Sequence, residues 1–257
     1  MIHYVILTTG SCGNCYAFYD GERTVLVDAG VTFTKLSSQL EAHGIPLSSL
    51  DSLFITHLHP DHSRGVGPLM RKTRIRAYIS DISHERNQEV MLRQRIKAEN
   101  LSLYSFGESI DRGSFHITPF RTSHDSEGSA GYFIGHEDGS FFLMTDTGRV
   151  PDDAFQYARD ADVEFIESNY DDDMLSNGHY TEALKRRIRG LYGHLSNKDA
   201  IDFASRTARH GDSVFFIHLS ENNNDPEIVR ELAFSRISSG IFCKVLARGE
   251  MTEGFIG

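Results

Sequence analysis

The sequence feature that most constrains this chain is a short motif of metal-binding residue types after an apolar segment: Thr56-His57-Leu58-His59-Pro60-Asp61-His62. In an extended chain, residues two apart point to the same side, so His57 and His59 can hold one cation. Pro60 ends the strand geometry, and the chain can then turn Asp61 and His62 towards a second cation. Imidazole and carboxylate groups together suit zinc, and also manganese or iron. Such groups are costly to bury without a counter-charge, so the motif predicts a metal site rather than a surface turn.

Further candidate ligands stand just beyond other apolar segments. These candidates are Asp28, His124, Asp146 and His218. Polar residues that directly follow strands share one edge of a sheet, which is where loops build functional sites. Two metal ions need more ligands than one motif supplies, so we expect these four residues to lie near it.

Hydrophobic patterning divides the chain into two β-rich blocks, each followed by helices. We expect strands at 4–8, 16–19, 24–27, 53–56 and 76–79, several within 101–144, and then strands at 163–167, 214–219 and 242–246. We expect helices at 32–43, 65–72, 83–98, 152–159, 180–189, 198–210 and 226–234. This order predicts an α/β protein in which two sheets pack face to face with helices outside, in four αββα layers. No linker or repeat stands out, so we expect residues 1–257 to form one domain.

The distribution of charge limits the class of partner. The net charge of −10 argues against nonspecific binding of polyanions over the whole surface. Residues 64–97 nevertheless contain nine basic and three acidic side chains. Such clusters are usually solvated helix faces, but this one begins directly after the metal motif and also suits contact with a phosphate backbone. No aromatic stacking motif accompanies it, so we expect no base-sequence specificity.

Cysteine content and hydropathy indicate the compartment. The chain has three cysteines, an odd and low number that argues for a reducing compartment such as the cytoplasm. Cys12 and Cys15 have redox-pair spacing, but no helix pattern follows them, which favours a glycine turn between strands. No apolar run approaches the roughly 18 residues of a membrane span, and the N-terminus lacks the basic start of a signal peptide. We therefore expect no membrane partner.

The motif, taken with His124, Asp146 and His218, resembles the metallo-β-lactamase-fold superfamily over nearly the whole chain. The resemblance implies the four-layer αββα sandwich and two divalent cations, with zinc first and manganese or iron as alternatives. It implies two sets of ligands joined by a bridging carboxylate: His57, His59 and His124 for one ion, Asp61, His62 and His218 for the other, and Asp146 between them. Asp28 matches a position that orients ligand histidines without binding the metal itself.

Further segments narrow the resemblance to the bacterial YycJ/WalJ-type proteins. These segments are Gly10-Ser11-Cys12-Gly13-Asn14-Cys15, Ile166-Glu167-Ser168-Asn169-Tyr170-Asp171, Gly193-His194-Leu195-Ser196-Asn197, and His218-Leu219-Ser220 with Asn222-Asn223. The resemblance to this group implies 5′-to-3′ exonuclease action, with DNA as the substrate.

The expected reaction is hydrolysis of a phosphodiester by a metal-bound hydroxide, because two cations about 3.5–4 Å apart lower the pKa of water towards about 7. Asp61 is expected to orient this nucleophile, and His194 to protonate the leaving 3′-oxygen. The loop after His194 leads into a helix N-terminus, which attracts phosphate oxygens. The candidate substrate contacts are Ser196, Asn197, Asn222 and Asn223, of which the last two are equally typical of a turn. For Glu167, Asn169 and Asp171 a structural or orienting role is favoured.

Other functions stay open, because this fold hosts many kinds of hydrolase. A small-molecule hydrolase, either a cyclic phosphodiesterase or a glyoxalase II-like thioesterase, would have a pocket too narrow for a strand. An RNA-processing nuclease of the RNase Z type is a closer alternative, although no glycine-rich insertion that could hold tRNA is evident. A metal-binding or scaffold protein without activity is disfavoured by the complete set of seven ligand positions.

Overall fold

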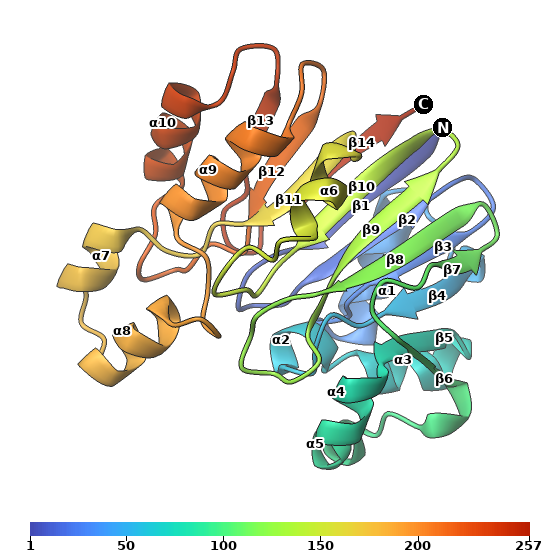
Figure 1. Cartoon of the computed structure of the whole chain (residues 1–257). Helices are drawn as coiled ribbons and strands as arrows, with labels where there is room; N and C mark the ends of the chain where they lie inside the picture. Colours follow the sequence, from blue (N-terminus) through green and yellow to red (C-terminus); the bar gives the residue numbers. More distant parts are fainter.

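Two seven-stranded sheets pack face to face in the computed structural model, which describes all 257 residues (Figure 1). The first sheet has the order β14-β1-β2-β3-β4-β5-β6, and the second has the order β13-β12-β11-β10-β9-β8-β7. The strands of the first sheet are β1 (Ile2–Thr8), β2 (Cys15–Tyr19), β3 (Thr24–Val27), β4 (Leu50–Phe54), β5 (Arg76–Ser80), β6 (Leu101–Tyr104) and β14 (Thr252–Ile256). Those of the second are β7 (Ile110–Arg112), β8 (Phe115–Arg121), β9 (Ala130–His136), β10 (Gly139–Met144), β11 (Val163–Glu167), β12 (Ser213–Ile217) and β13 (Phe242–Val245).

Helices cover the outer face of each sheet (Figure 1). The helices are α1 (Phe33–Ala42), α2 (Pro60–Ser63), α3 (Val66–Thr73), α4 (Asp81–Arg86), α5 (Gln88–Gln94), α6 (Ala154–Arg159), α7 (Asp172–Asn177), α8 (Glu182–Arg189), α9 (Asn197–Thr207) and α10 (Pro226–Arg236), with short 3₁₀ turns η1 (Leu47–Ser49) and η2 (Ala98–Asn100). Apolar residues of α1, α3 and α5 pack on the first sheet, and those of α6, α9 and α10 pack on the second. The predicted αββα order is therefore confirmed. No helix is both long and apolar enough to cross a membrane.

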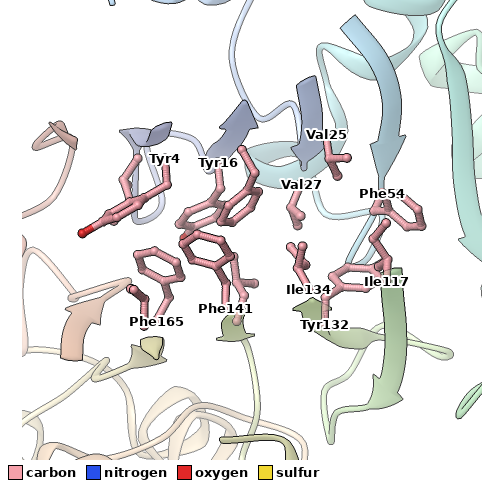
Figure 2. Close-up of a cluster of buried hydrophobic side chains, with 14 of the residues drawn as sticks. Tyr4, Tyr16, Val25, Val27, Phe54, Ile117, Tyr132, Ile134, Phe141 and Phe165 are labelled. Carbon is pink, nitrogen blue, oxygen red and sulfur yellow. The ribbon is translucent and has the colours of Figure 1, made fainter. Parts of the chain in front are cut away.

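The central core lies between the two sheets and is rich in aromatic side chains (Figure 2). Tyr4 on β1 meets the rings of Phe141 on β10 and Phe165 on β11 edge-on, with ring centroids 5.5 and 5.9 Å apart. The neighbouring residue on β1, Val5, points to the opposite face and joins the cluster under the outer helices. Strands buried on both faces in this way read as continuous apolar runs rather than as alternating patterns.

Parallel strands at the centre of each sheet bring their carboxyl ends to one edge. β3 runs parallel to β4 in the first sheet, and β10, β11 and β12 run parallel to one another in the second. The loops after these strands carry Asp28, the His57–His62 motif, Asp146 and His218, and Glu167 is the last residue of β11. The topology thus brings candidate residues from distant parts of the sequence to one end of the sandwich.

Three local expectations differ from the structure. The helix predicted at 83–98 is two helices, α4 and α5, separated at Asn87. The Asn87 side chain donates a hydrogen bond to the Ser83 carbonyl at 3.0 Å, and the backbone at Asn87 leaves helical geometry. Asparagine competes with helical hydrogen bonding in this way, which explains the break. Strand β14 and helix α7 were not anticipated from the sequence.

Candidate metal centre

Three of the candidate residues adopt a backbone conformation that is rare outside glycine. Asp28, Asp146 and His218 have φ angles of 60°, 51° and 58°, and each lies within two residues of the end of its strand. Left-handed geometry is strained for residues with a side chain, and such strain concentrates at functional sites. Here it redirects the chain at the sheet edge, so that Asp28 and Asp146 both contact His62, and His218 lies beside Asp146.

The histidine motif spans the loop after β4 and the first residues of α2. His59 is the N-cap of α2, Pro60 is its first residue, and Asp61 and His62 follow within the same turn. The ligand atoms of these residues gather with those of the other strand-end residues. Within each of three groups the ligand atoms lie within 4.8 Å of one another: His57, His59 and His124; His57, His62 and Asp146; and Asp61, His62 and His218. All seven side chains that the sequence singled out as ligands therefore meet in one place.

Asp146 stands between the two sets of histidines. Its Oδ2 atom lies 3.1 Å from Nε2 of His62 and 3.7 Å from Nε2 of His218. Its Oδ1 atom lies 3.7 Å from Nε2 of His124. Each carboxylate oxygen thus faces a different set, which is the arrangement a bridging ligand requires.

The donor atoms fit a pair of divalent cations. The Nε2 atoms of His57 and His218 are buried and have no hydrogen-bond partner in the protein. Buried polar atoms are nearly always paired, so two unpaired imidazole nitrogens beside a carboxylate need an explanation. Neutral imidazole nitrogens and carboxylate oxygens are the donors that zinc and similar cations prefer.

Hydrogen bonds to the opposite ring nitrogens hold the histidines in orientation. Nδ1 of His62 donates to Oδ2 of Asp28 at 2.6 Å, and Asp28 also accepts from the backbone N–H of Thr56 at 2.8 Å. Nδ1 of His124 donates to the carbonyl of Gly193 at 3.0 Å. Each of these bonds holds the ring so that Nε2 is the nitrogen that faces the centre, which is the function of the groups around metal-bound histidines.

Glu167 performs the same function for two rings at once. Its Oε1 atom accepts from Nδ1 of His194 at 2.7 Å and from Nδ1 of His218 at 3.0 Å. Its Oε2 atom accepts from the backbone N–H groups of Thr147 and Leu195 at 2.9 and 3.2 Å. This fully buried carboxylate therefore ties three loops together while it orients two site histidines.

The carboxylates make this buried region attractive to positive charge. Burial disfavours the charged form of His62, but Asp146 and Asp28 more than offset it and raise its pKa to about 10. Burial alone would raise the pKa of Asp146, yet His218 and His62 hold it well below its usual range. Burial and the nearby His62 place the pKa of His57 well below its usual value, so its ring is neutral. A cation or a proton therefore stabilises this cluster, and His57 offers a free lone pair.

A cavity of about 260 Å³ opens onto the centre. His59, Asp61, His124, Asp146, His194 and His218 form its inner part, and Tyr180, Leu184, Arg187 and Asn222 are among the residues that complete it. Arg187 donates to Oδ2 of Asp125 at 2.7 Å, and Oδ1 of Asp125 lies 3.4 Å from Nε2 of His59. Figure 1 shows that α8, which carries Arg187, projects from the sandwich together with α7.

The residues proposed from sequence as substrate contacts occupy different positions. Asn222 lines the cavity and donates to the hydroxyl of Tyr180 at 3.1 Å. Ser196 caps α9 by accepting from the Asp199 N–H. Asn197 is buried and donates to Oδ1 of Asn224 at 2.8 Å.

The remaining residue of that set, Asn223, is also buried, and its backbone N–H donates to the hydroxyl of Ser220. Of the four residues, only Asn222 lines the cavity. Sequence reasoning did not identify Arg187, Asp125 or Tyr180 as site residues. The sequence features that indicate Arg187 and Asp125 are the basic cluster Lys185, Arg186, Arg187 and Arg189, and the position of Asp125 directly after His124.

Comparison with known proteins adds a family and relatives. The model of the beta-lactamase superfamily domain matches residues 23–219. The chain is 33% identical to a protein of Streptococcus pneumoniae named exodeoxyribonuclease WalJ, over 94% of this chain and 92% of that one. It is 28% identical to exodeoxyribonuclease YycJ of Bacillus anthracis, over 89% and 86% of the two chains. The crystal structure of the metallo-beta-lactamase fold protein YhfI of Bacillus subtilis superposes with a TM-score of 0.74 at 19% identity, covering 98% and 99% of the two chains.

Proposed function

The chain belongs to the β-lactamase superfamily and, within it, to the YycJ/WalJ-type group of metal-dependent hydrolases, and we propose that it is a 5′-to-3′ exonuclease acting on DNA. The observation that carries the proposal is the meeting of seven ligand side chains at a cavity that also holds an arginine and a further histidine. The names of two relatives, both exodeoxyribonucleases, support DNA as the substrate class.

We propose that two divalent cations, zinc in the first place and manganese or iron as alternatives, are held by the seven ligands. His57, His59 and His124 would hold one ion, Asp61, His62 and His218 the other, and Asp146 would contact both. When bound, such cations lower the pKa of water and offset negative charge on phosphate oxygens.

Asp61 is proposed to orient the attacking water. Its Oδ2 atom lies 3.7 Å from Nε2 of His62 and 3.8 Å from Nε2 of His218, and a quarter of its side chain stays exposed to the cavity. A carboxylate in this position can act as a ligand through one oxygen and accept a hydrogen bond from water through the other.

His194 is proposed as the acid that protonates the leaving 3′-oxygen. Glu167 holds its Nδ1 atom, so Nε2 is the nitrogen available to a substrate in the cavity. Burial alone lowers the pKa of this ring, but Glu167 and Asp146 raise it above its ordinary value. These carboxylates therefore favour the protonated form of His194, the form that a general acid needs.

Two basic regions are proposed to contact the phosphate backbone. Arg187 lines the cavity, and its guanidinium can bind a phosphate oxygen beside the cleaved bond. Further along, Arg71, Arg74, Arg95 and Lys97 line a separate hollow of about 520 Å³ beside α3 and η2. These contacts carry no base information, so binding is expected to weaken with salt and to tolerate any sequence.

The direct test is degradation of 5′-phosphorylated duplex DNA, single-stranded DNA and RNA in the presence of Mn²⁺ or Zn²⁺. We expect DNA to be shortened from its 5′ end, with activity lost in His59→Ala and kept in His116→Ala, an exposed histidine on β8. If the parent shortens no polynucleotide, or if His59→Ala matches the parent, the proposal is wrong. Cleavage only of RNA, of a cyclic nucleotide or of a thioester would identify the corresponding alternative.

The role of His194 has its own test, because a good leaving group needs no acid. We expect His194→Ala to slow DNA cleavage by roughly 10²–10⁴-fold, the usual contribution of general acid catalysis. Hydrolysis of a nucleotide p-nitrophenyl phosphodiester, whose leaving group departs unprotonated, should be slowed far less. An equal loss on both substrates would contradict the assignment and would indicate that His194 supports the metal ligands instead.

A further inference from the structure

A second cluster of metal-binding residue types lies away from the catalytic cavity, where the two ends of the chain meet. It consists of His3 on β1, His43 directly after α1, and Glu253 on β14. β14 pairs with β1 in antiparallel register, with His3 opposite Phe255 and Val5 opposite Glu253. His3 and Glu253 therefore occupy the same face of the first sheet, the face on which α1 packs. Figure 1 shows the two termini side by side at this edge.

The three side chains converge on one carboxylate oxygen. Nε2 of His3 and Nδ1 of His43 each lie 2.8 Å from Oε2 of Glu253. The two histidine side chains are only 12% and 14% exposed, whereas Glu253 is 45% exposed. The His3 ring is stacked on Phe255, with ring centroids 4.3 Å apart. The nitrogens are thus held by packing, and the carboxylate keeps freedom to adjust.

The contacts of His43 indicate which of its two ring nitrogens can face a cation. Its Nε2 atom lies 3.0 Å from the thioether sulfur of Met251. A thioether has no hydrogen to donate, so a hydrogen bond at this contact uses a proton on Nε2 of His43. With the proton on Nε2, the lone pair of Nδ1 faces the Glu253 carboxylate. Two lone pairs at 2.8 Å repel one another unless a positive charge, either a proton or a metal ion, lies between them.

We propose that His3, His43 and Glu253 form a binding site for a divalent cation of the zinc type, separate from the catalytic centre. Two imidazoles and one carboxylate are a common set of protein ligands for zinc, with water in the remaining position. Ligands about 2.1 Å from a tetrahedral ion lie ~3.4 Å apart, so the present nitrogen–oxygen distances would have to open by ~0.6 Å. Rotation of the half-exposed Glu253 side chain can provide this change.

A cation at this position would join three elements that are remote in sequence. It would link the first strand, the end of the first helix and the last strand of the chain. Because the ion binds only when these elements are assembled, it would stabilise the folded state and hold the terminal strand β14 in its sheet. The inference does not depend on the reaction at the catalytic centre.

The test counts bound ions. Metal-free protein is titrated with Zn²⁺ against a chromophoric chelator, for the parent and for His43→Gln. We expect the parent to bind one more ion per chain than the variant. The matched control is His116→Gln, which alters an exposed imidazole paired with a single carboxylate, Asp111, and should bind as many ions as the parent. Equal numbers in the parent and in His43→Gln would overturn the proposal.

A second measurement uses the unaltered chain and so does not depend on how a variant folds. Diethyl pyrocarbonate modifies unprotonated histidine nitrogens, and peptide mass spectrometry locates the modification. We expect Zn²⁺ to protect His3 and His43 and to leave His116 as reactive as before. If Zn²⁺ leaves His3 and His43 reactive, the cluster is a hydrogen-bonded bridge only, and the proposal is wrong.

Discussion

Glu164 on β11 provides a quantitative test of how this fold responds to pH. Its side chain is fully buried on the outer face of the second sheet. Oε2 accepts a hydrogen bond from the Thr207 hydroxyl at 2.8 Å, while Oε1 has no partner. Burial, with a smaller contribution from Asp212, raises the pKa of Glu164 from 4.5 to about 8. The folded protein therefore holds a proton on this group that the unfolded chain releases above pH 4.5.

The sign and size of the effect follow from proton linkage. Between pH 4.5 and about 8 the native state binds one more proton than the unfolded state, so stability falls as pH rises. Each pH unit well inside this window costs about 1.4 kcal/mol. Between pH 5 and pH 8 the loss from this one group is about 3–4 kcal/mol, a large part of the stability of an ordinary domain.

Replacing Glu164 by glutamine removes the titration and preserves the shape of the side chain. We expect Glu164→Gln to be close to the parent in stability at pH 5 and more stable than it by about 3–4 kcal/mol at pH 8. Urea unfolding of metal-free protein, followed by circular dichroism at several pH values, measures the difference. The control is Glu231→Gln, an exposed position on α10. The reasoning is refuted if parent and Glu164→Gln lose stability in parallel from pH 5 to pH 8.

Three further predictions concern the metal centre. Asp28→Asn removes the charge that orients His62, so zinc affinity should fall about 10–100-fold in a competition titration, and unchanged affinity would contradict the role of Asp28. Gly30→Ala should displace the Asp61 loop and weaken metal binding, because a Cβ atom at Gly30 would lie 1.6 Å from the Asp61 carbonyl oxygen. In the control Gly135→Ala, the added Cβ atom meets nothing closer than 3.5 Å, so this variant should bind metal normally. Chelation of the two ions of the centre should lower the melting temperature by about 10–20 °C, or about 5–10 °C for each ion, if both were present at about 100 times their dissociation constants. Added Zn²⁺ should restore the melting temperature. An unchanged melting temperature after chelation would argue against ions bound to the native state.

The sequence identified the candidate metal ligands because their pattern is local or tied to strand ends. Four of these residues lie within a segment of six, where spacing alone fixes the relative directions of the side chains: His57, His59, Asp61 and His62. Asp146 and His218 each follow an apolar strand, and parallel strands end at the same edge of a sheet. Short-range geometry and the rules of sheet topology were therefore enough to predict the four-layer order and the candidate centre.

Other features depend on contacts between residues far apart in the sequence. β14 has a weak strand pattern and forms because β1, some 250 residues away, offers an unpaired edge. Glu167 is an ordinary strand residue until the fold places it between His194 and His218. Asn197 and Asn223 are polar residues in loops, where exposure is the usual expectation, yet tertiary packing buries both.

The sequence alone thus determined which side chains are candidate metal ligands and which strands precede them. Only the tertiary structure decided which polar groups orient those ligands, which face the cavity, and that His3, His43 and Glu253 meet at the joined ends of the chain. The physical reason is that periodicity records which face of an element is apolar, whereas the partners of a polar side chain are set by the packing of elements that the local sequence does not encode.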